Sequence, residues 1–225
     1  MADAGDAGTI ESRVQFERLV AAGDVRGRTI RGFAAPTAPL RGTDFDGVTL
    51  ERLDLGSADG ADARLVTARV QLVDGRRSEW RAALWQHVQF VDCDFTEAVV
   101  ARAQLVRCEF TRVRLGRWAA AHAHFSRCVF TDSELYGADF AGACFNNVQF
   151  HGYGKSTVSL TRANFAGATL IRVNLAEANL YGASLRNATL LACDLRSANL
   201  SSADLAGVRL VGCLTQDLDL DDATW

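Results

Sequence analysis

The sequence predicts an all-β solenoid, because a large apolar residue returns at every fifth position along most of the chain. From Phe45 to Trp225 the multiples of five are apolar with few exceptions, although only 48% of the whole chain is hydrophobic. The exceptions are Gly60, Gly75, Lys155 and Thr215. The residue two positions earlier is almost always small. A five-residue period fits neither a helix nor a strand, so the backbone must turn a corner every five residues and bury its side chains against neighbouring turns.

The repeat is clearest between Leu160 and Leu210, where blocks such as Ala-Asn-Phe-Ala-Gly and Ala-Asn-Leu-Tyr-Gly follow one another. The centres that define the core of this stretch are Phe165, Leu170, Leu175, Leu180 and Leu185. The pattern resembles that of the pentapeptide-repeat family, whose motif is A(D/N)LXX, over residues 41–225. The resemblance implies a right-handed quadrilateral β-helix in which four pentapeptides form one square coil. Residues twenty apart would then stack on one another, giving roughly nine coils.

The first forty residues carry the repeat only faintly. Residues 1–8 are polar and are expected to be disordered. Residues 9–40 are expected to form a cap, with a short amphipathic helix that has Thr9 as its N-cap and ends at Gly23, followed by an irregular first coil. The two prolines of that coil would prevent further strand pairing, and the helix would cover the unpaired end of the solenoid.

Two segments of the repeat region, 73–77 and 151–157, break the pattern. Val73-Asp74-Gly75-Arg76-Arg77 reads as a loop that bulges outward, and His151-Gly-Tyr-Gly-Lys-Ser-Thr157 places a lysine at an inward centre. Gly75 and Lys155 are eighty residues apart, a multiple of twenty. Both irregular segments are therefore predicted to lie on the same side of the rod.

The buried positions contain exceptions that predict compensating packing. Trp80 overfills a site sized for leucine, and the glycine twenty residues earlier, Gly60, would relieve the crowding. Cys108 and Cys128 are twenty apart, as are Cys193 and Cys213. Stacking on adjacent coils would permit disulfides, but cysteine is also a small buried residue, and a reducing cytosol favours that second interpretation.

Composition and motifs argue against an enzyme and against a membrane span. The formal net charge is −3, no run of eighteen apolar residues occurs, and the polar start is unlike a secretory signal, so we expect a cytoplasmic protein. Gly154-Lys155-Ser156-Thr157 lacks the earlier glycine of a phosphate-binding loop. His122 and His124 have no converging third ligand. No metal, cofactor or catalytic group is predicted.

Charge is sorted along the chain. Arginines recur at one outward corner position of the repeat: Arg102, Arg107, Arg112, Arg117 and Arg127. They could form a binding belt, or they could pair with acids twenty residues away, as in the ladders Asp92-Arg112-Asp132 and Arg77-Glu97-Arg117. Arg102, Arg107 and Arg127 have no acid at that spacing. The last coil is acidic, through Asp217, Asp219, Asp221 and Asp222.

The resemblance implies a non-catalytic rod that binds other proteins. The best-understood bacterial members of the family mimic DNA and protect DNA gyrase or topoisomerase IV from quinolones, an antibiotic-resistance function. This chain departs from them in its weak net charge, its basic middle and the lack of a C-terminal dimer-forming helix. The alternative is a structural scaffold for another protein partner. No direct nucleic-acid binding is expected, and both a monomer and an end-to-end homodimer remain open.

The surface residues that we predict to contact a partner come from the irregular segments, the unpaired arginines and the acidic end. They are Asp74, Arg76, Arg77, Arg102, Arg107, Arg127, His151, Tyr153, Lys155, Asp217, Asp219, Asp221 and Asp222.

Overall fold

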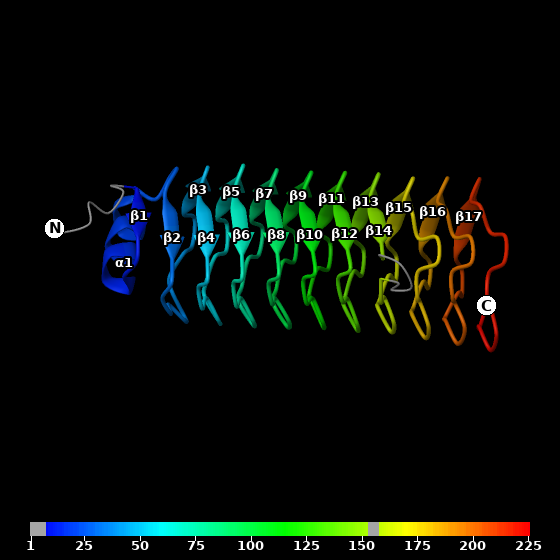
Figure 1. Ribbon diagram of the computed structural model, residues 1–225. Helices are drawn as coiled ribbons and strands as arrows, with labels where there is room; N and C mark the ends of the chain where they lie inside the picture. The colour runs from blue at the N-terminus through cyan, green and yellow to red at the C-terminus, as the bar shows by residue number, and fades with distance from the viewer. Residues whose placement is uncertain (1–7, 153–157) are drawn as a thin grey trace.

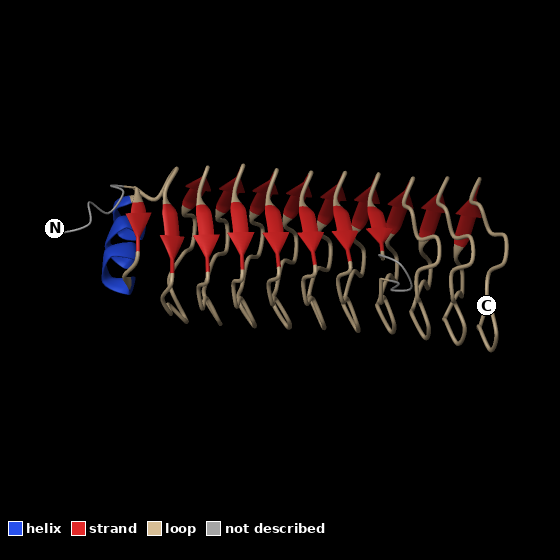
Figure 2. Ribbon diagram, viewed as in Figure 1, coloured by secondary structure: helices blue, strands red, loops and turns tan. Residues whose placement is uncertain are grey.

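The computed structural model describes residues 8–152 and 158–225 and shows a right-handed quadrilateral β-helix of about ten turns (Figure 1). A single helix lies at its N-terminal end. Residues 1–7, most of the segment expected to be disordered, lie outside the described residues. Four parallel ladders run along the rod, and we number the faces that carry them 1 to 4 in chain order. Strands occupy faces 1 and 4, whereas single bridges such as Asp54–Asp74 on face 2 and Asp59–Glu79 on face 3 join the other two (Figure 2).

The strands are two or three residues long, as the five-residue period requires. Face 1 contains β1 (Thr9–Ile10), β2 (Thr29–Arg31), β4 (Thr49–Glu51), β6 (Arg69–Gln71), β8 (Gln89–Val91), β10 (Glu109–Thr111), β12 (Val129–Thr131) and β14 (Gln149–His151). Face 4 contains β3 (Asp44–Asp46), β5 (Arg64–Val66), β7 (Leu84–Gln86), β9 (Gln104–Val106), β11 (His124–Ser126), β13 (Cys144–Asn146), β15 (Thr169–Ile171), β16 (Thr189–Leu191) and β17 (Arg209–Val211).

Each pentapeptide turns its corner at the residue two positions after the inward centre. These corner residues adopt a left-handed backbone conformation whether or not they are glycine, as at Arg107 with φ of 53°. The centre and the small residue before it point inward and form one continuous core. The predicted centres Phe165, Leu170, Leu175, Leu180 and Leu185 are all buried there.

The stacking distance changes from twenty to twenty-five residues around 151–158. Phe125 stacks on Phe145 twenty residues later, but Phe145 stacks on Leu170. Likewise Asp139 pairs with Asn164 on face 3. The inward period of five survives, and stacking returns to twenty residues beyond the segment, as between Thr169 and Thr189. The expectation of constant twenty-residue columns is therefore wrong only for pairs that span 151–158. One pentapeptide is therefore in excess between His151 at the end of face 1 and Val158 at the start of face 2.

The change of stacking distance also corrects the predicted alignment of the two irregular segments. The position stacked after Leu135 in the Gly75 column of face 2 is held by Leu160 and not by Lys155, because Leu135 donates its amide to Ser159. Lys155 itself lies outside the described residues.

The predicted loop at 73–77 is a regular part of face 2. Val73 and Gly75 are buried, and Asp74 bridges to Asp54 and Asp94 on either side. The glycine is explained by the next coil: a Cβ added at Gly75 would lie 2.3 Å from a ring carbon of Phe95. The phenylalanine fills the space that a side chain at position 75 would occupy, so the glycine compensates for bulk and does not mark a loop.

The N-terminal cap differs in detail from the prediction. Helix α1 (Arg13–Ala22) begins after Ser12, whose side chain accepts a hydrogen bond from the Gln15 amide, and ends at Gly23 as expected. Thr9, the predicted N-cap, instead lies in β1 and pairs with Thr29. The helix covers the N-terminal end of the solenoid (Figure 1) and buries Phe16 against Phe33, with ring centroids 5.6 Å apart.

The first coil is regular, although it contains two prolines. Ala34 and Pro39 bridge to Asp54 and Asp59 of the next coil. On face 3 the amide of Asp59 donates back to the preceding coil while that of Leu40 donates forward. The nitrogen of Pro39 occupies the backward-facing position, where α1 and not another coil precedes it, so the missing N–H leaves no partner unsatisfied.

The packing compensation predicted for Trp80 is present. A Cβ on Gly60 would lie 2.3 Å from the indole of Trp80, so the tryptophan uses the space that the glycine leaves open. The Trp80 indole N–H donates to Ser78 Oγ at 2.8 Å. Two other buried indoles, Trp85 and Trp118, find no acceptor for their N–H among the described residues.

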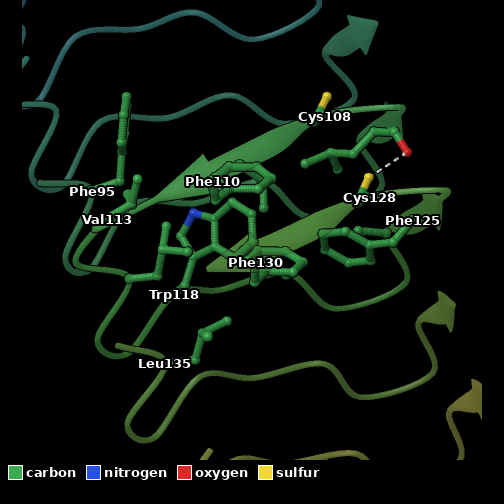
Figure 3. Close-up of a cluster of buried hydrophobic side chains, with 14 of the residues drawn as sticks. Phe95, Cys108, Phe110, Val113, Trp118, Phe125, Cys128, Phe130 and Leu135 are labelled. Carbon is green, nitrogen blue, oxygen red and sulfur yellow. Dashed lines mark hydrogen bonds between the residues drawn. The ribbon is translucent and has the colours of Figure 1, made fainter. Parts of the chain in front are cut away.

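All six cysteines are free thiols, and all except Cys144 lie in or against the core. Cys108 and Cys128 stack as predicted, and each donates at 3.3 Å to a carbonyl of the preceding coil, on Trp85 and Leu105 respectively. Figure 3 shows the two stacked thiols and the hydrogen bond of Cys128. Ser133 makes the same contact to the Phe110 carbonyl. The small inward position therefore offers a carbonyl that a thiol or hydroxyl can satisfy.

Candidate protein-interaction surface

Outward side chains form straight columns, because every coil repeats the same corners. Two predicted ion-pair ladders are present in part. Arg112 donates to both carboxylate oxygens of Asp92, at 2.6 and 2.9 Å, and Arg117 donates to Glu97 at 2.9 Å. The Arg112 guanidinium lowers the pKa of Asp92. Two of the five arginines of the predicted belt are therefore neutralised by neighbouring coils.

The charged residues of 73–77 also pair with one another. Arg76 donates from Nε to Asp74 at 2.9 Å and lies 4.0 Å from Asp94, which pairs with Arg114 at 3.1 Å. The hydrogen bond from Arg76 lowers the pKa of Asp74. Arg77, the corner residue, forms no ion pair with any described residue. This part of face 2 is a compact paired network with little net charge to offer a partner.

Arg107 and Arg127 lie one above the other at the corner between faces 4 and 1. The next two corner residues there are Asn147 and, across the longer spacing, Arg172, while His87 precedes Arg107. The amides of these residues confirm the order: Arg107 donates to the Ser126 carbonyl, Arg127 to Asn146 and Asn147 to Ile171. We call His87, Arg107, Arg127, Asn147 and Arg172 the basic column. It follows the corner between the row β7 to β15 and the row β8 to β14 (Figure 1).

The basic column borders an open groove of about 500 Å³. The residues that line the groove are Gln86, His87, Val106, Arg107, Ser126, Arg127, Asn146, Asn147 and Arg172. All are polar except Val106; none is acidic, and the one aromatic ring is the imidazole of His87. We call this feature the basic groove.

The arginines of the basic groove are not neutralised by the described residues. Arg107, Arg127 and Arg172 form no ion pair there, and Arg107 instead donates from Nη1 toward His87 Nε2 at 3.2 Å. Along the groove, face 4 contributes no carboxylate. Face 1 contributes Glu109, which accepts a hydrogen bond from Gln89 at 3.2 Å.

Stacked like charges cost stability. Coils rise by about 4.8 Å, so two exposed guanidinium groups on adjacent coils repel by about 1 kcal/mol in a water-like dielectric. An anion bound between them would remove this penalty. Arg102, the third predicted unpaired arginine, lies at the corner between faces 3 and 4 beside Ala82 and His122 and also lacks an ion pair with described residues.

The remaining predicted residues lie apart from this groove. His151 is half-buried at the end of β14, with Nε2 2.8 Å from Gln149 Oε1, whereas Tyr153 and Lys155 lie outside the described residues. The four C-terminal acids, Asp217, Asp219, Asp221 and Asp222, are exposed on the last coil. Beside them Leu210, Val211, Leu214, Leu220 and Trp225 are exposed apolar residues.

The sequence alone does not predict that Arg172 belongs to the basic column, because constant twenty-residue columns place Gly167 after Asn147. One signal could have revealed the shift. The pentapeptide 153–157 has Tyr153 at the small inward position and Lys155 at the centre, so it satisfies neither requirement of a coil face. If this pentapeptide is left out when the twenty-residue spacing is counted, Arg172 becomes the corner residue that follows Asn147.

Comparison with known proteins agrees with the fold. The family model described as Pentapeptide repeats (8 copies) matches residues 120–152, 159–196 and 178–214. No curated protein sequence matches the chain. Within the described residues, no helix is long and apolar enough to cross a membrane.

Several solved structures are similar. HetL, a pentapeptide repeat protein involved in heterocyst differentiation regulation from the cyanobacterium Nostoc sp. strain PCC 7120, is 21% identical over 96% of this chain and 94% of its own, with a TM-score of 0.41. Rfr23 from the cyanobacterium Cyanothece 51142 is 24% identical over 54% and 90%, with a TM-score of 0.30. Full-length QnrB1, a plasmid-mediated fluoroquinolone resistance protein, is 18% identical over 84% and 92%, with a TM-score of 0.33. The repeat itself identifies this chain as a member of the pentapeptide-repeat family.

Proposed function

We propose that the protein is a non-catalytic rod that binds another protein through its outward columns. The observation that carries the proposal is the basic groove, a row on a rigid scaffold whose arginines form no ion pair with the described residues. A structural ladder would alternate in sign, as Asp92 and Arg112 do. A row of one sign is better suited to an external partner of opposite charge.

The most specific form of this proposal is that the partner is a type II topoisomerase, DNA gyrase or topoisomerase IV, which the rod protects from quinolone-type poisons. It rests on the family resemblance and on the exposed acids of the last coil, which would stand in for DNA phosphates. It also requires the protein to act in the cytoplasm. The basic groove favours the second candidate, a scaffold for a different protein. A DNA mimic presents negative charge to its partner, and a positive groove does not contribute to that.

A supercoiling assay separates the two candidates. Purified protein would be added to DNA gyrase with and without a fluoroquinolone. Restored supercoiling in the presence of the drug, or direct inhibition without it, supports topoisomerase binding. No effect at micromolar protein contradicts it and leaves the scaffold.

A deletion that tests the irregular segment 151–157 must preserve the five-residue period of the inward positions. Removing 151–157 takes away His151 of β14 and shifts every later inward position by two residues. Removing 153–157 takes away one whole pentapeptide, so that the twenty-residue stacking continues and Arg172 still follows Asn147. We expect this variant to fold like the parent protein. Unchanged protection by it would contradict a role for the segment in topoisomerase binding.

A further inference from the structure

We infer that the basic groove binds an acidic segment of the partner protein, held as an extended peptide along the rod. The inference rests on the proposed protein-binding function and adds the chemistry of the partner. Three guanidinium groups, those of Arg107, Arg127 and Arg172, border one groove, and none forms an ion pair with a described residue; the Arg107 guanidinium instead contacts His87 of the same column. Guanidinium groups bind carboxylates in a bidentate manner, which makes an acidic side chain the matching ligand.

The length of the groove fits a short extended peptide. From His87 to Arg172 the column climbs four coils, or about 19 Å at the usual spacing of neighbouring strands. Six residues of extended chain cover about the same distance. The spacing of carboxylates along an extended peptide differs from the spacing of arginines on successive coils, and the long arginine side chains can adjust to that difference.

The lining of the groove favours a peptide over a nucleic acid. Proteins that bind single strands stack successive bases on aromatic side chains, whereas this lining contains no Phe, Tyr or Trp and a single imidazole, that of His87 at one end of the basic column. It contains Gln86, Asn146 and Asn147, whose amide groups both donate and accept hydrogen bonds. Such side chains can satisfy the backbone of an extended peptide while the arginines bind its carboxylates.

The test uses the full chain and a fluorescein-labelled peptide of eight glutamates, with binding followed by fluorescence anisotropy at low salt. Octaglutamine, a single-stranded oligothymidylate, a DNA duplex and inorganic phosphate are the comparison ligands. The groove variant carries Arg107→Gln, Arg127→Gln and Arg172→Gln. The matched control carries Arg77→Gln, Arg102→Gln and Arg162→Gln, which removes three charges from the other corners, where the backbone is also left-handed.

We expect saturable binding of octaglutamate to the parent protein, weakened about tenfold or more in the groove variant and less than about threefold in the control. Circular dichroism of both variants checks that they fold. Equal weakening by the two variants would show attraction by overall charge and would overturn the assignment. Tighter binding of oligothymidylate, the duplex or phosphate than of octaglutamate, or no binding of octaglutamate, would also overturn it. A failure here combined with topoisomerase protection would remove the groove assignment and leave the proposed function.

Discussion

Gly60 offers the sharpest test of how this core is packed. Its backbone is not left-handed, so the only objection to a side chain is the lack of space. A Cβ at position 60 would lie 2.3, 2.4 and 2.8 Å from three ring atoms of Trp80. The indole cannot move aside freely, because its N–H donates to Ser78 Oγ, which in turn donates to the Gly75 carbonyl. Gly60→Ala should therefore destabilise the fold.

The size of the effect has two parts. Forcing an extra methyl group into a packed core costs about 1–3 kcal/mol. If the ring shifts, the buried hydrogen bond to Ser78 is lost and adds about 1–3 kcal/mol. We therefore expect Gly60→Ala to lower the free energy of unfolding by about 2–6 kcal/mol. Gly116→Ala is the control, since its backbone is also not left-handed and its Cβ would meet nothing nearer than Thr96 Cγ2 at 3.8 Å, an ordinary contact.

Urea denaturation followed by tryptophan fluorescence and by circular dichroism measures both variants. Trp80→Leu, alone and combined with Gly60→Ala, completes a double-mutant cycle. A smaller residue at position 80 should leave room for the methyl group at position 60, so the clash should be relieved in the double variant. Adding Gly60→Ala to Trp80→Leu should then cost less than adding it to the parent by about 1 kcal/mol or more. Gly60→Ala within about 0.5 kcal/mol of the parent, or additive behaviour in the cycle, would refute the reasoning.

Three further predictions concern charge, thiols and assembly. Arg112 lowers the pKa of Asp92, so this pair contributes stability above about pH 4 that is lost as the pH falls through the lowered value. Asp92→Asn should therefore reduce the unfolding midpoint at pH 7 and reduce it by less at about pH 2.5. An equal loss at both pH values would contradict this. Burial raises the pKa of Cys93 and of Cys193 to about 11, so both should resist iodoacetamide at pH 7 until the protein unfolds, as mass spectrometry would show; rapid labelling of the native protein would count against it. If copies pair end to end through the last coil, Leu220→Glu should restore the monomer mass of 24.3 kDa in light scattering, and a parent protein that is already monomeric at every concentration would exclude the pairing.

The buried half of the fold could be read from the sequence, because each inward position has a fixed size and polarity. That is why Trp80, Gly60 and the stacked cysteines were placed correctly. The cap was harder, since Thr9 and Ser12 are both good N-caps and only the pairing of β1 with β2 decides between them. Gly75 could not be assigned in the same way, because a glycine is compatible both with a loop and with a site that leaves room for a ring of the next coil, here Phe95.

The candidate site could be predicted only in part. The unpaired state of Arg107 and Arg127 followed from twenty-residue spacing, which holds as far as residue 149. Arg172 could not be found in that way, because a period of five in the core does not fix how many pentapeptides make a turn. That number decides which residues become neighbours on adjacent coils. Inward neighbours stay large and apolar whichever they are, whereas outward neighbours change in charge.

The excess pentapeptide has a consequence for how such a surface can change. Every face accepts the same inward pair, so a pentapeptide added to the coil itself would leave the interior nearly unaltered. It would, however, turn everything downstream by a quarter revolution about the rod axis. Gly167 would then follow Asn147, and Arg172 would move to the next edge. Inserting or deleting five residues thus gives this architecture a way to reshuffle its outer charges in a single event, without redesigning the interior.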